Sequence, residues 1–256
     1  MTPFAWTDAR VREALGLARE RGEEAIAYAG VSTDSRTVAR EALFVALVGE
    51  RFDGHDFVAD AAAAGAAGAV VSRPPDGVED LVLYRVDDTL EALGRLARYR
   101  RRHLSARVVG ITGSSGKTTT KDLVRGALEP AYRVHATRGN LNNRIGLPRT
   151  VLDAPDETQI LVLEMGTNEP GEIGILTGIA EPGYGVVTTV SETHLEELET
   201  LEGVLAEKLD LLRGLTEPGV GVVSDEPPVL AEAARGAAER VRVAGWSEAA
   251  DPDLRP

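Results

Sequence analysis

The residues best suited to phosphate chemistry stand together near the middle of the chain. An apolar run, "VVGIT", leads into a short stretch rich in glycine and serine, and a segment of helical character follows it. Glycines let successive backbone N–H groups face a phosphate, a lysine reaches the outer phosphates, and a hydroxyl at the start of a helix is a ligand for Mg²⁺. We therefore predict that this loop binds ATP or a similar triphosphate together with Mg²⁺. The predicted nucleotide-binding residues here are Gly113, Ser114, Ser115, Gly116, Lys117, Thr118 and Thr119.

The glycine spacing departs from the usual phosphate-binding loop. The first glycine of that pattern, five residues before Gly116, falls at Ile111, whereas glycines stand at positions 110 and 113. The loop is therefore a variant, and a glycine-rich turn carrying a solvated lysine is the alternative interpretation. The GxGxxG fingerprint of dinucleotide-binding proteins is absent from this stretch.

Polar residues also follow the next three strand-like runs. The segment "TRGNLNNRIGLP" contains Asn140 and Asn143, which either orient a ligand or cap a helix and form turns. Glu164 ends the run "QILVLE", where a second Mg²⁺ ligand would face Thr118; a buried structural glutamate is the alternative. His194 follows the run "GVVTTV" and is a candidate metal or phosphate ligand, although a lone histidine often has no such role.

Lys208 lies on a segment of helical character, residues 202–212, that leads away from these strand ends. Sequence spacing alone favours a surface lysine paired with Glu207 or Glu197.

Regular alternation of strands and helices must position these residues. Apolar strands that alternate with helices predict a parallel sheet covered on both faces, and ligands bind such sheets at the carboxyl ends of the strands. The fold class is therefore α/β with a mostly parallel sheet. The expected strands are 107–112, 132–137, 159–165, 185–190 and 219–223, and the expected helices are 117–128, 146–152, 171–179, 202–212 and 229–241.

The first hundred residues form a smaller α/β domain in this interpretation. They contain the strand-like runs "ALFVAL", "AGAVV" and "LVLYRV", and the basic amphipathic stretch 90–104 predicts a helix that links two domains. We place the N-terminal domain with its linker helix at 1–104 and the central domain at 105–256.

The composition limits the classes of function. The chain has 256 residues, 43% of them hydrophobic and 27% charged, so it can bury a substantial core. Its formal net charge of −13 argues against a general nucleic-acid binder or a protein that binds anionic membranes. The chain has no cysteine, hence no disulfide and no thiolate metal site, and no secretion signal or membrane-spanning run is visible. We expect a cytoplasmic monomer.

Four motifs in this order resemble the Mur ligase family, the ATP-dependent amide-forming enzymes of peptidoglycan precursor synthesis. They are "TGSSGKTTTK", "NLNNRIGLP", "LEMGTNEPGEI" and "THLEELETLEGVLAEK". The combination of "NLNN" with "EMGTNEPGEI" is most similar to members that join D-alanyl-D-alanine to UDP-N-acetylmuramoyl-tripeptide. The segment from "STDSRTVAREALF" to "AGAVV" resembles the UDP-sugar-binding domain of the last two ligases of that pathway, and the similarity covers about residues 31–245.

The resemblance implies a role for each candidate residue. The acceptor carboxylate attacks the γ-phosphate of ATP, and the amine of D-alanyl-D-alanine then attacks the acyl phosphate, so catalysis depends on positioning and charge neutralisation. Lys117 would stabilise the γ-phosphate, Thr118 and Glu164 would hold one Mg²⁺, and His194 a second. Lys208 matches the family lysine that CO₂ carbamylates, which converts the ammonium into a carboxylate that supports the second ion. Nucleotide and substrate groups would contact Asn140, Asn143 and Asn168, and the UDP-sugar site would include Asp34, Ser35, Arg36, Gly54 and His55.

The resemblance departs from the family in two places. Ser224, followed by Asp225, stands where the family has an asparagine that contacts the adenine end of the nucleotide. The family also has a third, C-terminal domain, so the resemblance implies that this chain comprises the N-terminal domain and an incomplete central domain. We expect the chain by itself to bind ATP and the UDP-sugar with little or no ligation.

Three alternatives stay open on the sequence alone. One is the related ligase that adds the third amino acid to UDP-N-acetylmuramoyl-dipeptide, which shares the "TDSR" and "DGHDF" features. Another is a non-catalytic nucleotide-binding module, although Lys117, Glu164, His194 and Lys208 are all present. An unrelated P-loop kinase or GTPase is disfavoured because the chain lacks an NKxD base-specificity motif.

Overall fold

The structure is a computed structural model that describes residues 3–18, 26–75, 78, 81–191 and 200–255. The chain divides into two compact units, residues 1–103 and 104–256, each with its own core. The α/β fold class and the mostly parallel sheets predicted from the sequence are confirmed.

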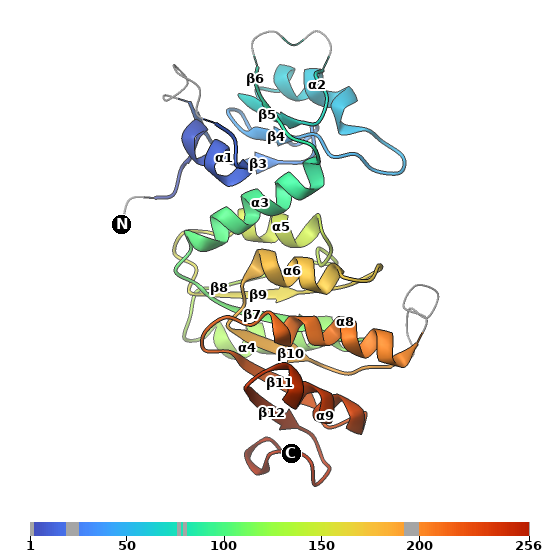
Figure 1. The fold of residues 1–256 in the computed structure, drawn as a ribbon. Helices are drawn as coiled ribbons and strands as arrows, with labels where there is room; N and C mark the ends of the chain where they lie inside the picture. The colour runs from blue at the N-terminus through green and yellow to red at the C-terminus, as the bar shows by residue number, and fades with distance from the viewer. Residues whose placement is uncertain (1–2, 19–25, 76–77, 79–80, 192–199, 256) are drawn as a thin grey trace. The chain divides into compact units, whose positions relative to one another are not determined.

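The first unit is built on a four-stranded parallel sheet in the order β3-β4-β5-β6 (Figure 1). Short β-branched and aliphatic runs form its strands, and small residues of the intervening helix allow close packing against them. A separate antiparallel pair, β1 with β2, precedes this sheet. The elements are β1 (Trp6–Thr7), α1 (Asp8–Leu15), β2 (Ala27–Tyr28), β3 (Val31–Ser32), β4 (Leu43–Val45), η1 (Gly54–Phe57), α2 (Val58–Ala63), β5 (Gly68–Val71), β6 (Val82–Arg85) and α3 (Thr89–Arg102).

Side-chain caps fix where the helices of this unit begin. Asp88 accepts hydrogen bonds from the backbone N–H groups of Leu90 (2.7 Å) and Glu91 (3.0 Å), so α3 begins at Thr89. Thr7 caps α1 in the same way, and Gly16 ends that helix with a left-handed φ of 71°.

The second unit contains a six-stranded sheet in the order β12-β11-β10-β7-β9-β8, and every neighbouring pair is parallel. All carboxyl ends of the strands therefore lie at one edge of the sheet. The elements are β7 (Arg107–Thr112), α4 (Lys117–Leu128), β8 (Val134–Ala136), α5 (Gly146–Leu152), β9 (Ile160–Glu164), α6 (Glu172–Ala180), β10 (Tyr184–Val187), α8 (Leu201–Arg213), β11 (Val220–Ser224), α9 (Pro228–Ala237), β12 (Arg240–Ala244) and η2 (Pro252–Leu254).

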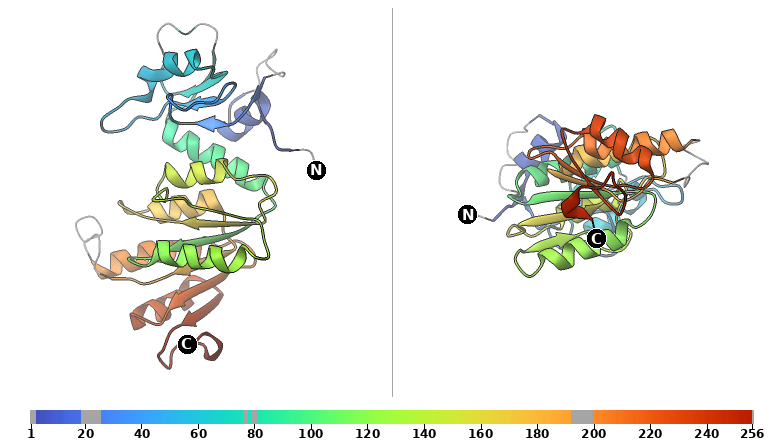
Figure 2. Two further views of the ribbon diagram at one scale, coloured as in Figure 1. Left: turned by 180° about the vertical axis from the view of Figure 1, so that it is seen from behind. Right: turned by 90° about the horizontal axis from the view of Figure 1, so that it is seen from below.

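Helices cover both faces of this sheet, as the two opposite views show (Figures 1 and 2). α5, α6, α8 and α9 form a continuous layer on one face, in which α6 packs on α8 and α8 on α9. α4 lies on the other face against β7, β8 and β9. The strands are consequently apolar on both sides, which explains their unbroken hydrophobic runs.

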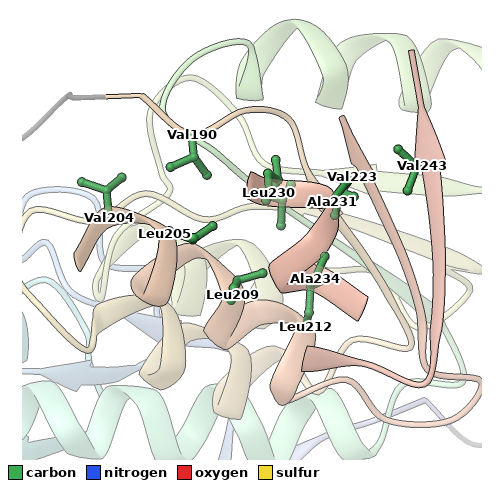
Figure 3. Close-up of a cluster of buried hydrophobic side chains, with 11 residues drawn as sticks. Val190, Val204, Leu205, Leu209, Leu212, Val223, Leu230, Ala231, Ala234 and Val243 are labelled. Carbon is green, nitrogen blue, oxygen red and sulfur yellow. The ribbon is translucent and has the colours of Figure 1, made fainter. Parts of the chain in front are cut away.

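A cluster of buried aliphatic side chains forms the core between α8, α9 and the sheet (Figure 3). Leucines of the two helices meet valines of β10, β11 and β12, and this burial fixes the helices on the sheet. The expected helix 229–241 was wrong at its end. α9 stops at Ala237, and residues 240–244 form β12, because the alternation "RVRV" suits an edge strand with one buried valine, Val243.

None of the helices in the described ranges is long and apolar enough to cross a membrane.

Candidate nucleotide-binding site

The predicted phosphate loop, residues 113–116, connects β7 to α4 at the carboxyl edge of the sheet. Gly113 has a φ of +146°, and a Cβ there would collide with the Oγ1 of Thr188, so a residue with a side chain does not fit. Gly116 has a φ of +77° and immediately precedes α4. The chain thus turns sharply twice and begins the helix with its amino end toward the loop, which is the arrangement that favours an anion.

Threonines that follow β10 hold this loop from the side. The Thr188 hydroxyl donates to the Ser115 carbonyl at 2.5 Å, and the Ser114 N–H donates to the Thr189 carbonyl at 2.9 Å. The loop is therefore braced against the neighbouring strand, so its backbone is preorganised for a ligand.

Lys117 begins α4 and folds back over the loop. Its Nζ donates to the Gly113 carbonyl at 2.7 Å, with the Ser114 carbonyl at 3.5 Å. Burial lowers the pKa of this lysine, and the negative charge of Glu164 opposes that effect. Lys117 is therefore not the fully solvated lysine of the alternative interpretation.

Glu164 ends β9 and is 2% exposed. Its Oε2 accepts a hydrogen bond from the Thr118 hydroxyl at 2.9 Å, and its Oε1 accepts one from the Nδ2 of Asn142 at 2.8 Å. The Thr137 hydroxyl accepts the backbone N–H of Glu164 at 3.0 Å. Strand order explains this convergence, because β9 lies between β7 and β8 and all three end at the same edge.

Asn142 is the residue of this site that the sequence prediction did not select. Three asparagines stand within four positions, and spacing does not distinguish them. The Oδ1 of Asn143 accepts the backbone N–H groups of Ile145 (3.1 Å) and Gly146 (2.8 Å), so it forms the turn before α5. Asn140 is exposed beside it. The ligand contacts predicted for Asn140 and Asn143 stay predictions.

Lys208 lies on α8 and is buried, with 2% exposure, so the surface position favoured by spacing alone was wrong. Burial and then the charge of Lys117 lower its pKa to about 8, whereas the charges of Glu207 and Glu172 act in the opposite direction. A substantial fraction of this lysine is therefore the neutral amine near pH 8.

Glu207 does not pair with its neighbour Lys208 in a surface salt bridge. Its carboxylate instead accepts backbone N–H groups at Gly171 (2.7 Å) and Ile173 (2.8 Å), and the Thr167 hydroxyl lies at 3.3 Å. These contacts hold the loop that follows β9 at the start of α6. That loop carries Asn168, which is exposed and whose N–H donates to the Glu172 carboxylate at 2.6 Å.

His194 lies outside the described residues, as does Glu197. The metal role predicted for His194 therefore stays a prediction.

The residues predicted for a UDP-sugar site occupy two turns of the first unit. Asp34 pairs with Arg36 at 2.7 Å, and the Arg36 side chain is 85% exposed; Ser35 lies between them. The His55 ring is buried, with Nδ1 2.6 Å from the Asp53 carboxylate and Nε2 accepting the Ser72 N–H at 2.9 Å. His55 thus has both ring nitrogens engaged within the protein.

Close packing against Leu47 explains why position 54 is a glycine. A Cβ at this position would lie 2.7 Å from the backbone N and O of Leu47, so glycine is required where the two segments meet. The geometry gives Gly54 and His55 a role in shaping this turn, and their contact with a ligand stays a prediction.

The oxygens at the phosphate loop suit Mg²⁺. This ion is usually bound by one or two protein oxygens together with phosphate oxygens and water. Thr118 and Glu164 offer a hydroxyl and a buried carboxylate oxygen 2.9 Å apart. Over the described ranges, no group of three or more His, Asp or Glu side chains forms a closed metal cage. An open pair of oxygens next to a phosphate loop fits a cation that bridges protein and nucleotide.

A parallel sheet with a glycine-rich loop between β7 and α4 defines the class of P-loop α/β domains. Within that class, the model of the Mur ligase middle domain matches residues 111–254, and that of the Mur ligase family catalytic domain matches residues 27–101. The chain belongs to the Mur ligase family.

Individual relatives agree with the family assignment. Over 218 residues the chain is 45% identical to the UDP-N-acetylmuramoyl-tripeptide–D-alanyl-D-alanine ligase of Bacillus subtilis, a match that covers 85% of this chain and 48% of that protein. The chain spans about half the length of the curated relatives it matches.

Solved structures with the same fold include MurF from Acinetobacter baumannii, with a TM-score of 0.84, 33% identity and coverage of 95% of this chain and 54% of that one. The MurF ligase from Thermotoga maritima, solved in complex with ADP, gives a TM-score of 0.78 at 33% identity and covers 84% of this chain and 49% of that one.

Proposed function

We propose that this protein is the nucleotide- and UDP-sugar-binding part of an ATP-dependent ligase that joins D-alanyl-D-alanine to UDP-N-acetylmuramoyl-tripeptide. The observation that carries the ATP site is the pair Thr118–Glu164 beside Lys117 on a braced phosphate loop. The named activity of the Bacillus subtilis relative supports the choice of substrates, and we propose that the protein acts in the cytoplasm.

In this proposal the reaction has two steps. A carboxylate oxygen of the tripeptide attacks the γ-phosphorus of ATP, and the bond to the bridging oxygen breaks to release ADP. The amine of D-alanyl-D-alanine then attacks the acyl carbon, loses a proton and displaces inorganic phosphate. Phosphoryl transfer of this kind depends on positioning and on neutralising charge, with little covalent work for the protein.

The residues of the site have matching tasks. The ammonium of Lys117 leaves the Gly113 carbonyl and moves to the γ-phosphate, where it offsets the charge that develops on transfer. Thr118 and Glu164 would hold Mg²⁺, which would neutralise phosphate charge. Asn142 fixes the rotamer of Glu164 through its Oε1, and the loop backbone of residues 113–119 binds the phosphates.

Lys208 would act as a carbamate. Its neutral amine attacks CO₂ to form a new N–C bond and releases one proton, which yields a carboxylate. Burial supports this step because it lowers the pKa of Lys208 to about 8 and so supplies the neutral nucleophile. The carboxylate would then support a second Mg²⁺ together with His194.

The UDP-sugar would bind the first unit. The exposed guanidinium of Arg36 is suited to a diphosphate, and Asp34 orients it through two hydrogen bonds at 2.9 and 2.7 Å. Ser35 adds a hydroxyl in the same turn. We propose that the whole protein acts as a monomer on UDP-N-acetylmuramoyl-peptide and D-alanyl-D-alanine.

Calorimetric titration of Mg·ATP into the 256-residue chain tests the nucleotide site. We expect saturable binding that Lys117→Ala weakens about 10- to 100-fold, because one charge-assisted contact to phosphate is lost. Arg125→Ala is the matched control, since it removes a cation from the exposed side of the same helix and should leave the affinity unchanged. Equal binding by the wild-type and Lys117→Ala chains would contradict the site.

Binding of the UDP-sugar acceptor distinguishes the two ligase hypotheses. We expect UDP-N-acetylmuramoyl-tripeptide to bind the chain, and Arg36→Ala to weaken that binding. Preferential binding of UDP-N-acetylmuramoyl-dipeptide would favour the ligase that adds the third amino acid. Binding of ATP with no affinity for either UDP-sugar would favour a nucleotide-binding module.

A further inference from the structure

The pairing between β7 and β10 continues past the ends of the two strands. Thr112 and Val187 are the last residues paired within the strands. One step further, the Thr188 N–H donates to the Thr112 carbonyl at 2.9 Å, and the Ser114 N–H donates to the Thr189 carbonyl at 2.9 Å. The first residues of the phosphate loop therefore lie beside the chain that leaves β10.

At the next step of this pairing, a side chain takes the place of a main-chain carbonyl. The Ser191 N–H donates to the Oγ of Ser114 at 3.0 Å, and the same hydroxyl donates to the Ser191 carbonyl at 3.2 Å. The main-chain carbonyl of Ser114 is meanwhile 3.5 Å from the Nζ of Lys117. The hydroxyl thus keeps the two chains together at the point where the backbone turns into the phosphate loop.

Both hydrogen-bond donors of Ser114 are engaged within the protein. Its N–H donates to the Thr189 carbonyl, and its hydroxyl donates to the Ser191 carbonyl. A phosphate oxygen needs a donor and cannot use the carbonyl oxygen that remains. Direct binding of phosphate by Ser114 would therefore require one of these bonds to break, whereas the N–H groups that follow it in the loop do not have this constraint.

We propose that Ser114 is a positioning residue of the nucleotide site, a role that rests on the proposed ATP site. Its hydroxyl holds the phosphate loop against residues 188–191, so phosphate binding is coupled to the order of this segment. The coupling is reciprocal, because a phosphate that orders the loop also stabilises the bonds to Ser191, and loss of these bonds makes the loop less preorganised. The partner groups at Ser191 are main-chain groups, so the contact requires a hydroxyl only at position 114.

Calorimetric titration with Mg·ADP measures the contribution of this hydroxyl. Ser114→Ala should bind Mg·ADP about 3- to 10-fold more weakly than the wild-type chain, as expected for the loss of neutral hydrogen bonds. Ser114→Thr retains a hydroxyl and should restore the affinity. Thr189→Val is the matched control. It removes a hydroxyl from the same segment, one that donates to the Glu226 carbonyl at 3.4 Å, and should leave the affinity unchanged.

Hydrogen exchange at the Ser191 amide reports the bond itself. In the wild-type chain, Mg·ADP should slow this exchange. In Ser114→Ala the amide should exchange about 3- to 10-fold faster, and Mg·ADP should no longer slow it. Exchange within β7 should be the same in both chains. A purely structural role of Ser114 would accelerate exchange in β7 as well and would not make exchange at Ser191 depend on the nucleotide.

The outcomes distinguish the role of Ser114 from the proposed ATP site. Equal Mg·ADP affinity in the wild-type and Ser114→Ala chains would overturn the role of Ser114 and leave the nucleotide site in place. Ser114→Thr that binds as weakly as Ser114→Ala would overturn it too, as would wild-type exchange at Ser191 that ignores Mg·ADP. This last measurement needs no variant, so it decides the question even if Ser114→Ala fails to fold. Absence of Mg·ADP binding by the wild-type chain would overturn the proposed ATP site itself.

Discussion

At the scale of single residues, the phosphate loop depends on two glycines with different tasks. Gly113 provides both a positive φ and space, because the Thr188 hydroxyl occupies the place of a Cβ. Gly116 also has a positive φ, but the nearest heavy atom to its missing Cβ is 3.9 Å away. Substitutions at these two glycines can therefore distinguish the cost of a steric collision from the cost of an unfavourable backbone conformation.

Gly113→Ala should lower the free energy of unfolding by about 3 kcal/mol, since backbone strain and a steric collision add. Gly116→Ala, which introduces strain without a collision, should lower it by about 1 kcal/mol. Urea unfolding followed by circular dichroism measures both. The double variant Gly113→Ala/Thr188→Ala removes the collision, so it should recover part of the lost free energy of unfolding. A double variant as unstable as Gly113→Ala would disprove the steric explanation.

The burial of the charged Lys208 side chain lowers the free energy of unfolding of the protein. Its folded pKa of about 8 lies below the 10.5 of an exposed lysine, so the unfolded state binds the proton more tightly. The cost of burying the ammonium is fully present below pH 8 and is relieved as the pH rises from 8 to 10.5. A buried site kept in this state agrees with a functional role.

Lys208→Met should therefore raise the free energy of unfolding by on the order of 1 kcal/mol at pH 7. The difference from the wild-type chain should shrink as the pH rises toward 10. Urea titrations at several pH values in buffer free of CO₂ measure it. Loss of stability in Lys208→Met at pH 7 would show that the ammonium is favourably paired.

At the scale of elements, one carboxylate joins α8 to the beginning of α6. Glu207 accepts N–H groups from Gly171 and Ile173, which would otherwise lack partners at the start of a helix. The loop fixed in this way follows β9, the strand that ends in Glu164. The position of α8 is therefore coupled to the geometry of the nucleotide edge.

Glu207→Gln should lower the free energy of unfolding by about 2 kcal/mol, because the charge-assisted bonds to two backbone N–H groups weaken. Hydrogen exchange at Gly171 and Ile173 should accelerate more than exchange in β7. Glu202→Gln is the control on the exposed side of the same helix. Uniform acceleration throughout the second unit would show that Glu207 contributes only to global stability.

At the scale of the whole molecule, the chain contains two units with separate cores. The phosphate loop, Glu164 and Lys208 all belong to the second unit, whereas Arg36 and His55 belong to the first. Nucleotide binding and UDP-sugar binding should therefore be separable by dividing the chain.

A fragment of residues 104–256 should fold alone and bind Mg·ADP with the affinity of the 256-residue chain. Circular dichroism and calorimetry measure folding and binding, and the fragment should show no affinity for UDP-N-acetylmuramoyl-tripeptide. A folded fragment that has lost ADP binding would show that the first unit contributes to the nucleotide site.

The sequence by itself determined the order of the elements and the identity of the phosphate loop. Apolar runs alternating with helices are local patterns, and a parallel sheet brings their ends to one edge. Glycines, a lysine and a hydroxyl between a strand and a helix are local as well. The fold class, the family and the proximity of Thr118 to Glu164 could therefore be predicted before any coordinates were known.

Only the tertiary structure decided which of several equivalent residues meet. Asn142 reaches Glu164, while Asn143 forms a turn, although both stand in the same run. Lys208 is buried because α8 packs on α6 and the sheet, and the His55 ring is enclosed by a distant strand end at Ser72. Burial and partners depend on contacts between residues far apart in sequence, and spacing along the chain carries no information about them.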